Sequence, residues 1–143
     1  MFILDTNVVS ETMQPAPSLL VMNWFARQPK KQFFVTTITV AEIFYGVELL
    51  PIGKRRDKLL TEAEAMFDED FAARLLPFDE AAARIFPQIA VARRKQGRPI
   101  SEFDAQIAAI ARSRNAILAT RNTADFEGCG LRLVNPWHQE KSS

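Results

Sequence analysis

The chain has 143 residues, 48% of them hydrophobic, and a formal net charge of +1. A chain of this size can bury a core of its own, so we expect one domain, and its balanced charge excludes binding to nucleic acid through a global positive field. Its single cysteine, Cys129, and single histidine, His138, exclude a disulfide framework and argue against zinc sites and histidine-based triads. No apolar run is long enough to span a bilayer and the N-terminus has the pattern of a strand, not of a signal peptide, so we expect a cytoplasmic protein.

Segments with strand and helix patterns alternate along the chain. Apolar and β-branched runs predict strands at residues 2–5, 33–38, 75–78, 116–120 and 131–134, and Pro77 favours an edge position for the third. Helices are predicted at 19–27, from a Thr39 cap to Leu50, at 54–71, from an Asp79 cap to Gly97, and at 103–112 after a Ser101 cap. We expect Pro87 to kink or split the fourth helix. The alternation predicts an α/β fold with a central parallel sheet and helices on both faces.

Four acidic residues lie at or near the junctions between these elements. Asp5 ends the first strand, Glu42 and Asp104 are expected in first helical turns, and Asp125 follows the strand 116–120 after a short loop. In open α/β sheets, ligands bind at the edge where the strands' carboxyl ends lie. If the four acids converge there, their oxygens make a site for a hard divalent cation, and their repulsion without metal raises at least one pKa.

Each of these acids also has a purely structural interpretation. Thr39-x-x-Glu42 and Ser101-x-x-Asp104 both fit the capping box, in which the acid satisfies an orphan amide at the start of a helix. Asp125 suits a turn, and Asp5 can bond its own backbone. The joint placement at one edge is what favours a functional site over four separate caps and turns.

Two basic runs, at residues 54–58 and 93–98, are interpreted as solvated helix faces. The alternative is that they contact phosphates along a substrate.

Short stretches stand in order along nearly the whole chain: FILDTNVVSE at 2–11, TVAE at 39–42, LPFD at 76–79, Asp104 with IAA at 107–109, ATRNT at 119–123 and NPW at 135–137. Together they resemble PIN-domain proteins of the VapC type, the toxins of bacterial toxin–antitoxin pairs, and the FitB-like branch in particular. The resemblance implies a single PIN-like domain over residues 1–143, built as a three-layer α/β/α sandwich around a parallel sheet. We expect residues 139–143 at its end to be mobile.

The resemblance also implies an activity and partners. The activity is that of a Mg²⁺- or Mn²⁺-dependent endoribonuclease, acting as the toxin of a type II toxin–antitoxin pair. The partners are an RNA substrate, a cognate antitoxin and a second copy in a homodimer, with DNA contacted only through the antitoxin. The family's acids correspond to Asp5, Glu42 and Asp104, which are expected to hold the metal. Its hydroxyl and amide helpers correspond to Thr6, Asn7 and Thr120.

The fourth acidic position departs from the family pattern. Many relatives carry an aspartate where this chain has Asn122, and Asp125 follows three residues later. If Thr123 starts a helical turn, residues 122 and 125 are neighbours on one face. We expect Asp125 to supply negative charge and Asn122 to position a water or a phosphate oxygen.

Two other functions are compatible with parts of the sequence. A haloacid-dehalogenase-type phosphatase also begins with a strand ending in aspartate, but it needs a second aspartate where this chain has Asn7. A non-catalytic interaction protein of the same fold would show no metal binding and no dependence on Asp5.

Overall fold

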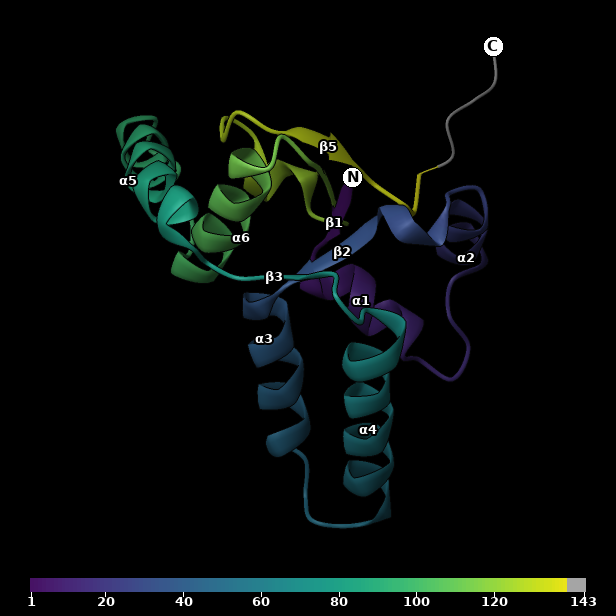
Figure 1. Cartoon of the computed structure of the whole chain (residues 1–143). Helices are drawn as coiled ribbons and strands as arrows, with labels where there is room; N and C mark the ends of the chain where they lie inside the picture. The colour runs from purple at the N-terminus through teal and green to yellow at the C-terminus, as the bar shows by residue number, and fades with distance from the viewer. Residues whose placement is uncertain (139–143) are drawn as a thin grey trace.

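In the computed structural model, which describes residues 1–138, five parallel strands form one sheet in the order β3-β2-β1-β4-β5 (Figure 1). The strands are β1 (Phe2–Leu4), β2 (Phe33–Thr36), β3 (Leu75–Leu76), β4 (Ile117–Ala119) and β5 (Arg132–Val134). The central strand β1 pairs with β2 and β4, so that Ile3 stands opposite Phe34 and Leu118. Because all pairs are parallel, the carboxyl ends of the strands lie at one edge of the sheet.

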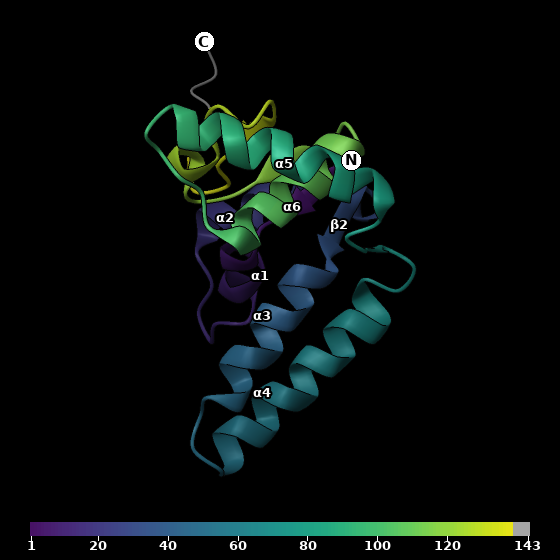
Figure 2. The same cartoon turned by 90° about the vertical axis from the view of Figure 1, so that its left-hand side faces the viewer.

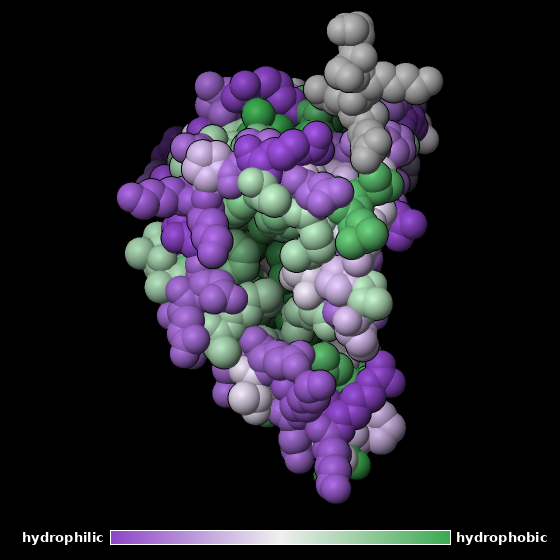
Figure 3. All heavy atoms as spheres, turned by 90° about the vertical axis from the view of Figure 1, so that its right-hand side faces the viewer, coloured by the Kyte–Doolittle hydropathy of each residue, from purple (hydrophilic) through white to green (hydrophobic). Residues whose placement is uncertain are grey.

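Helices cover both faces of the sheet, as the sequence predicts. They are α1 (Thr6–Thr12), α2 (Leu19–Ala26), α3 (Thr37–Glu48), α4 (Lys54–Ala65), α5 (Glu80–Lys95) and α6 (Glu102–Ser113). α3 and α4 lie side by side as a hairpin that extends away from the sheet (Figure 2). The face drawn in Figure 3 is hollowed near its centre, where apolar side chains are seen between polar margins. No helix within residues 1–138 is long and apolar enough to cross a membrane.

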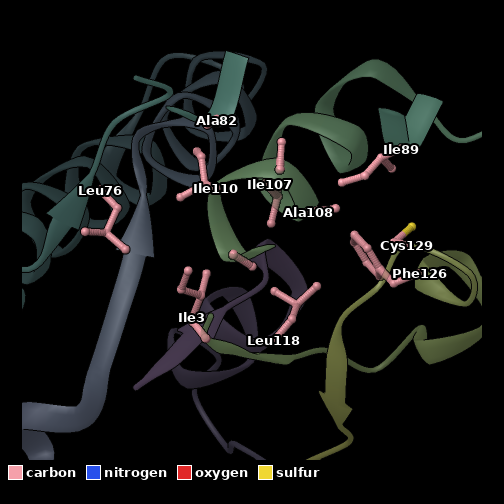
Figure 4. Close-up of a cluster of buried hydrophobic side chains, with 13 residues drawn as sticks. Ile3, Leu76, Ala82, Ile89, Ile107, Ala108, Ile110, Leu118, Phe126 and Cys129 are labelled. Atoms are coloured by element: carbon pink, nitrogen blue, oxygen red, sulfur yellow. The ribbon is translucent and has the colours of Figure 1, made fainter. Parts of the chain in front are cut away.

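Successive residues of β1 pack into different cores. Ile3 belongs to a cluster that includes Leu118 and, from the helices α6 and α5, Ile107 and Ile89 (Figure 4). Leu4 belongs to a second cluster, formed with α1, α2 and α3 around Trp24. Side chains of a strand alternate between the two faces of a sheet, so a strand buried on both faces marks the middle layer of a sandwich. The predicted three-layer α/β/α fold is therefore confirmed.

The start of α3 differs from the prediction. The Thr36 hydroxyl accepts a hydrogen bond of 3.2 Å from the Thr39 amide, so the helix begins at Thr37 and not after Thr39. The predicted Thr39 cap and its capping box with Glu42 are wrong, and Glu42 lies in the second turn. The β-branched run around Thr37 favours a strand by propensity, but the Thr36 cap stops β2 there and starts the helix. The other two caps are confirmed, since Asp79 accepts from the Ala82 amide at 3.0 Å and Ser101 accepts from the Asp104 amide at 3.2 Å.

Three further expectations are corrected. α5 runs unbroken through Pro87, so the proline does not split it. The predicted helix 54–71 is α-helical only to Ala65 and continues as a π-helical turn, Met66–Asp70. In the second basic run, Arg94 and Arg98 are exposed but Arg93 is only 4% exposed, so that run is not a uniformly solvated face. The expectation that residues 139–143 are mobile lies outside the described residues.

Candidate active site

The carboxylate of Asp5 is held at the carboxyl end of β1. Asp5 caps α1, and its Oδ1 accepts a hydrogen bond of 2.8 Å from the Thr6 amide. Its Oδ2 accepts from the Thr120 hydroxyl at 2.8 Å and from Asn7 Nδ2 at 3.3 Å. The residue is only 5% exposed. These bonds fix both carboxylate oxygens in place before any ligand binds.

The start of α1 and the residues after β4 lie together around Asp5, because β1 and β4 are neighbours in the sheet. The Thr120 hydroxyl, at the end of β4, also accepts from the Asn122 amide at 3.1 Å. Asn7 Oδ1 accepts from the Arg121 amide at 3.3 Å. The first residues of α1 and the residues after β4 therefore form one rigid rim.

Glu42 is tied to the same rim from α3. Glu42 Oε1 accepts a hydrogen bond of 2.9 Å from the Thr6 hydroxyl, whose oxygen also lies 3.0 Å from that of Thr39. Thr6 thereby links the acid of α3 to the strand end that carries Asp5.

All four acids line a single pocket of about 410 Å³. Asp104 reaches it from the third position of α6. Asn122 and Asp125 reach it from a 3₁₀-helical turn, Thr123–Phe126, in which the Asp125 amide donates to the Asn122 carbonyl at 3.0 Å. The predicted helical turn at Thr123 is thus present, and residues 122 and 125 share the pocket.

Burial, with a smaller contribution from neighbouring negative charge, raises the pKa of three of these acids. Burial, with smaller contributions from the charges of Asp104 and Glu42, raises the pKa of Asp5 to about 6 against the hydrogen bonds from Thr120 and Thr6. Burial also raises the pKa of Glu42, and the Asp104 charge adds to this while the bond from Thr6 opposes it. The pKa of Asp104 is raised by burial and by the Asp125 charge, against Ser101 and the Arg93 guanidinium. The carboxylates therefore lack enough nearby positive charge to offset their burial and their mutual repulsion.

The donor set fits a hard, hydrated cation. Within residues 1–138, no three acidic, histidine or cysteine side chains approach closely enough to form a complete set of metal ligands. Mg²⁺ commonly keeps several waters and binds through one or two carboxylates together with substrate phosphates. A buried acid with a raised pKa, flanked by further acids, is suited to such an ion.

A family model described as the PIN domain matches residues 2–127. The chain belongs to the PIN-domain family. It is 38% identical over 138 residues to toxin FitB of Neisseria gonorrhoeae, covering 96% of this chain and 99% of that protein. It is 36% identical over 137 residues to VapC ribonuclease Y4jK of Sinorhizobium fredii, covering 96% and 98%. A solved structure of FitAB bound to an IR36 DNA fragment matches with a TM-score of 0.92 and 38% identity, over 100% of both chains.

Three polar residues that line the pocket of this PIN domain were not predicted. Ser10, Glu11 and Gln14 line the acidic pocket from α1 and the turn after it. No helix was predicted at residues 6–12, where the structure has α1. A signal was present, because residues 7, 10, 11 and 14 are polar and spaced by three and four, which places them on one helical face.

Proposed function

We propose that this PIN-domain protein is a Mg²⁺- or Mn²⁺-dependent endoribonuclease and the toxin of a type II toxin–antitoxin pair. The observation that carries the proposal is the single pocket in which the buried Asp5 meets Glu42, Asp104 and Asp125. The names of the relatives agree with it, since one is a toxin and another a VapC ribonuclease, each matched over nearly its whole length.

In this proposal Asp5 and Asp104 would hold the cation, and Glu42 would bind it directly or through water. The chemistry that Mg²⁺ or Mn²⁺ would supply there is polarisation of a phosphodiester oxygen and activation of a water for attack. Thr120 and the Thr6 amide keep Asp5 oriented. The hydrogen bonds on Asp5 take up lone pairs on both oxygens, so the carboxylate has few orientations left to lose on binding.

The proton of the attacking water needs an acceptor. In this proposal the acceptor is Glu42, which the Thr6 hydroxyl orients, or Asp125, which lines the same pocket. The Asn122 amide brings no charge and is suited to positioning a water or a phosphate oxygen. In-line attack on the phosphorus then leaves a 5′-phosphate and a 3′-hydroxyl.

A partner protein has a surface available beside the site. A cavity of about 650 Å³ lies between α1, α3 and α4, and its walls include the apolar side chains of Ile43, Val47, Leu50 and Leu59. It shares Thr6, Ser10, Gln14 and Glu42 with the acidic pocket, so the two are continuous. An amphipathic helix of an antitoxin would lay its apolar face there and bring a basic residue to the acids. Contact with DNA would then be made through the antitoxin.

Three further parts of the proposal concern the state of the molecule. The chain is a single PIN-like domain, since both hydrophobic clusters share the sheet. It works as a homodimer in the cytoplasm, where its RNA substrate and antitoxin are made.

Growth after induced expression tests the proposal. Wild-type protein should arrest growth, Asp5→Asn and Asp104→Asn should not, and the antitoxin gene supplied together with the wild type should restore growth. Circular dichroism of the purified variants controls for folding. A fully expressed, folded wild type that leaves growth unaffected would instead support the non-catalytic interaction protein.

A further inference from the structure

Arg93 is a buried arginine whose charge meets no carboxylate at ion-pair distance within residues 1–138. It lies near the C-terminal end of α5 and is 4% exposed. Burying a guanidinium removes it from water at a large cost, so such residues persist where the surrounding groups use the charge. Its contacts identify what those groups are.

The guanidinium donates hydrogen bonds to backbone carbonyls of the segment after β4. Nη1 donates to the carbonyls of Asp125 and Glu127, the latter at 3.1 Å, and lies 3.6 Å from the sulfur of Cys129. These carbonyls stand at the end of the 3₁₀-helical turn Thr123–Phe126, where helical structure leaves acceptors without partners. A cation there satisfies them and offsets the negative end of the turn.

Arg93 is itself fixed by a reciprocal pair of bonds. Its Nε donates to the Arg98 carbonyl at 2.8 Å, and the Arg98 amide donates to the Arg93 carbonyl at 3.0 Å. Arg98 adds a second, exposed contact, since its Nη2 donates to the Ala124 carbonyl at 2.9 Å. Arg93 near the end of α5 and Arg98 in the loop after it therefore bind three backbone carbonyls in and just after the turn, those of residues 124, 125 and 127.

The segment at this turn supplies the two pocket residues, Asn122 and Asp125, at which the chain departs from the family pattern. Asn122 precedes the turn and Asp125 lies within it, and both side chains are exposed and lack the dense bonding that fixes Asp5. Phe126 is buried in the core and anchors the turn from its inner side. The Arg93 charge also opposes the rise in the pKa of Asp104 that burial causes.

We propose that Arg93 is a positioning residue whose guanidinium holds the 122–127 segment, and with it Asp125, in place at the acidic pocket. The inference rests on the proposed metal-dependent activity of that pocket. Arg93 touches neither substrate nor metal, and it acts by fixing the backbone from which Asp125 projects. A planar fork suits this task better than an ammonium, because it reaches several carbonyls at once.

The test measures Mn²⁺ affinity by calorimetry without RNA, and kcat and KM for RNA cleavage, in one set of variants. Arg93→Met keeps the apolar volume and removes the fork, and Arg93→Lys keeps the charge. Arg84→Met is the matched control, because Arg84 is an exposed arginine of the same helix that pairs with Glu80. Arg93→Met should weaken Mn²⁺ binding by about tenfold and lower kcat by about 10–100-fold with little change in KM. Arg93→Lys should recover part of both losses, and the control should match the wild type.

A double variant separates positioning from general stabilisation. In the Asp125→Asn background, Arg93→Met should change Mn²⁺ affinity by less than about twofold, because the group that it positions is already gone. The same tenfold loss in both backgrounds would overturn the proposal, as would wild-type affinity and kcat in Arg93→Met. If Arg93→Met does not fold, Arg98→Met should still weaken Mn²⁺ binding, because it removes the exposed bond to the Ala124 carbonyl and the 3.5 Å ion pair with Glu127. Unchanged affinity in both Arg98→Met and Arg93→Lys would then overturn the proposal. A wild type that neither binds Mn²⁺ nor cleaves RNA would instead refute the proposed function.

Discussion

Replacing Asp5 by asparagine should stabilise the metal-free protein near neutral pH while removing its activity. The pKa of Asp5 is raised from its ordinary value of 3.8 to about 6, chiefly by burial. At about 1.4 kcal/mol per pKa unit, the ionised carboxylate costs the folded state about 3 kcal/mol. Asparagine removes that cost, but its NH₂ group replaces one of two oxygens that both accept hydrogen bonds, Oδ1 from the Thr6 amide and Oδ2 from Thr120 and Asn7, so at least one bond is lost. A net gain of about 1–2 kcal/mol remains, which raises Tm by a few degrees.

The stabilisation by Asp5→Asn should depend on pH, because it comes from the ionisation of Asp5 in the wild type. The folded protein holds its Asp5 proton up to about pH 6, whereas the unfolded chain loses it near pH 4. The folded state therefore binds more protons in this window, and wild-type stability falls as the pH rises through it. The gain from Asp5→Asn should be full above about pH 7 and turn into a net loss of about 1–2 kcal/mol near pH 4, where the ionisation cost is gone and only the lost hydrogen bonding remains.

Urea unfolding in EDTA at pH 7.5 and pH 4.5 measures both effects. Asp68→Asn, which changes an exposed acid, is the control and should match the wild type at both pH values. Adding Mn²⁺ should stabilise the wild type by about 2.7 kcal/mol at a hundred times its Kd, and Asp5→Asn much less. A loss of stability in Asp5→Asn that is equal at both pH values would refute the reasoning and make Asp5 a structural cap of α1.

Three other predictions follow from single contacts. Asp125→Asn should weaken Mn²⁺ binding and slow cleavage, each by about tenfold or more. Asn122→Ala should lower the cleavage rate with little effect on Mn²⁺ affinity. If Asp125→Asn keeps both values near those of the wild type, the site has only three working acids. Thr6→Val removes the hydroxyl that donates to Glu42 and should lower kcat by about tenfold, whereas Thr6→Ser keeps the hydroxyl and should keep kcat near the wild-type value. Equal losses of kcat in both variants would contradict an orienting role. Thr36→Ala should cost about 1 kcal/mol in urea unfolding through loss of the α3 cap, and Thr36→Ser should cost less; an equal cost would assign the effect to packing.

The sequence was sufficient for the parts of the fold set by local pattern. Alternating strands and helices predicted the parallel sheet, and Asp79 and Ser101 cap their helices as expected. It was also sufficient to bring Asp5, Glu42 and Asp104 to one edge, because that edge follows from parallel strand order. These features depend on residues close in sequence or on a topology with few alternatives.

Other features depend on tertiary contacts that no local pattern carries. The choice between Thr36 and Thr39 as the cap of α3 is settled by where β2 leaves the sheet. Arg93 lies in a run of basic residues that is typical of a solvated face, and only the chain that returns after β4 supplies the carbonyls that bury it. The helix α1 is short and follows Asp5 at once, so its polar face was not recognised as a wall of the pocket.

RNA cleavage by the purified protein under controlled metal supply tests the central claim most directly. Cleavage of a labelled RNA should stop in excess EDTA, return with Mg²⁺ or Mn²⁺, and leave ends that carry 5′-phosphate. Asp5→Asn and Asp104→Asn, purified in parallel, should show no cleavage, which excludes a contaminating nuclease. Cleavage by the wild type that persists unchanged in excess EDTA, and that both variants lack, would contradict a metal-dependent site at these acids.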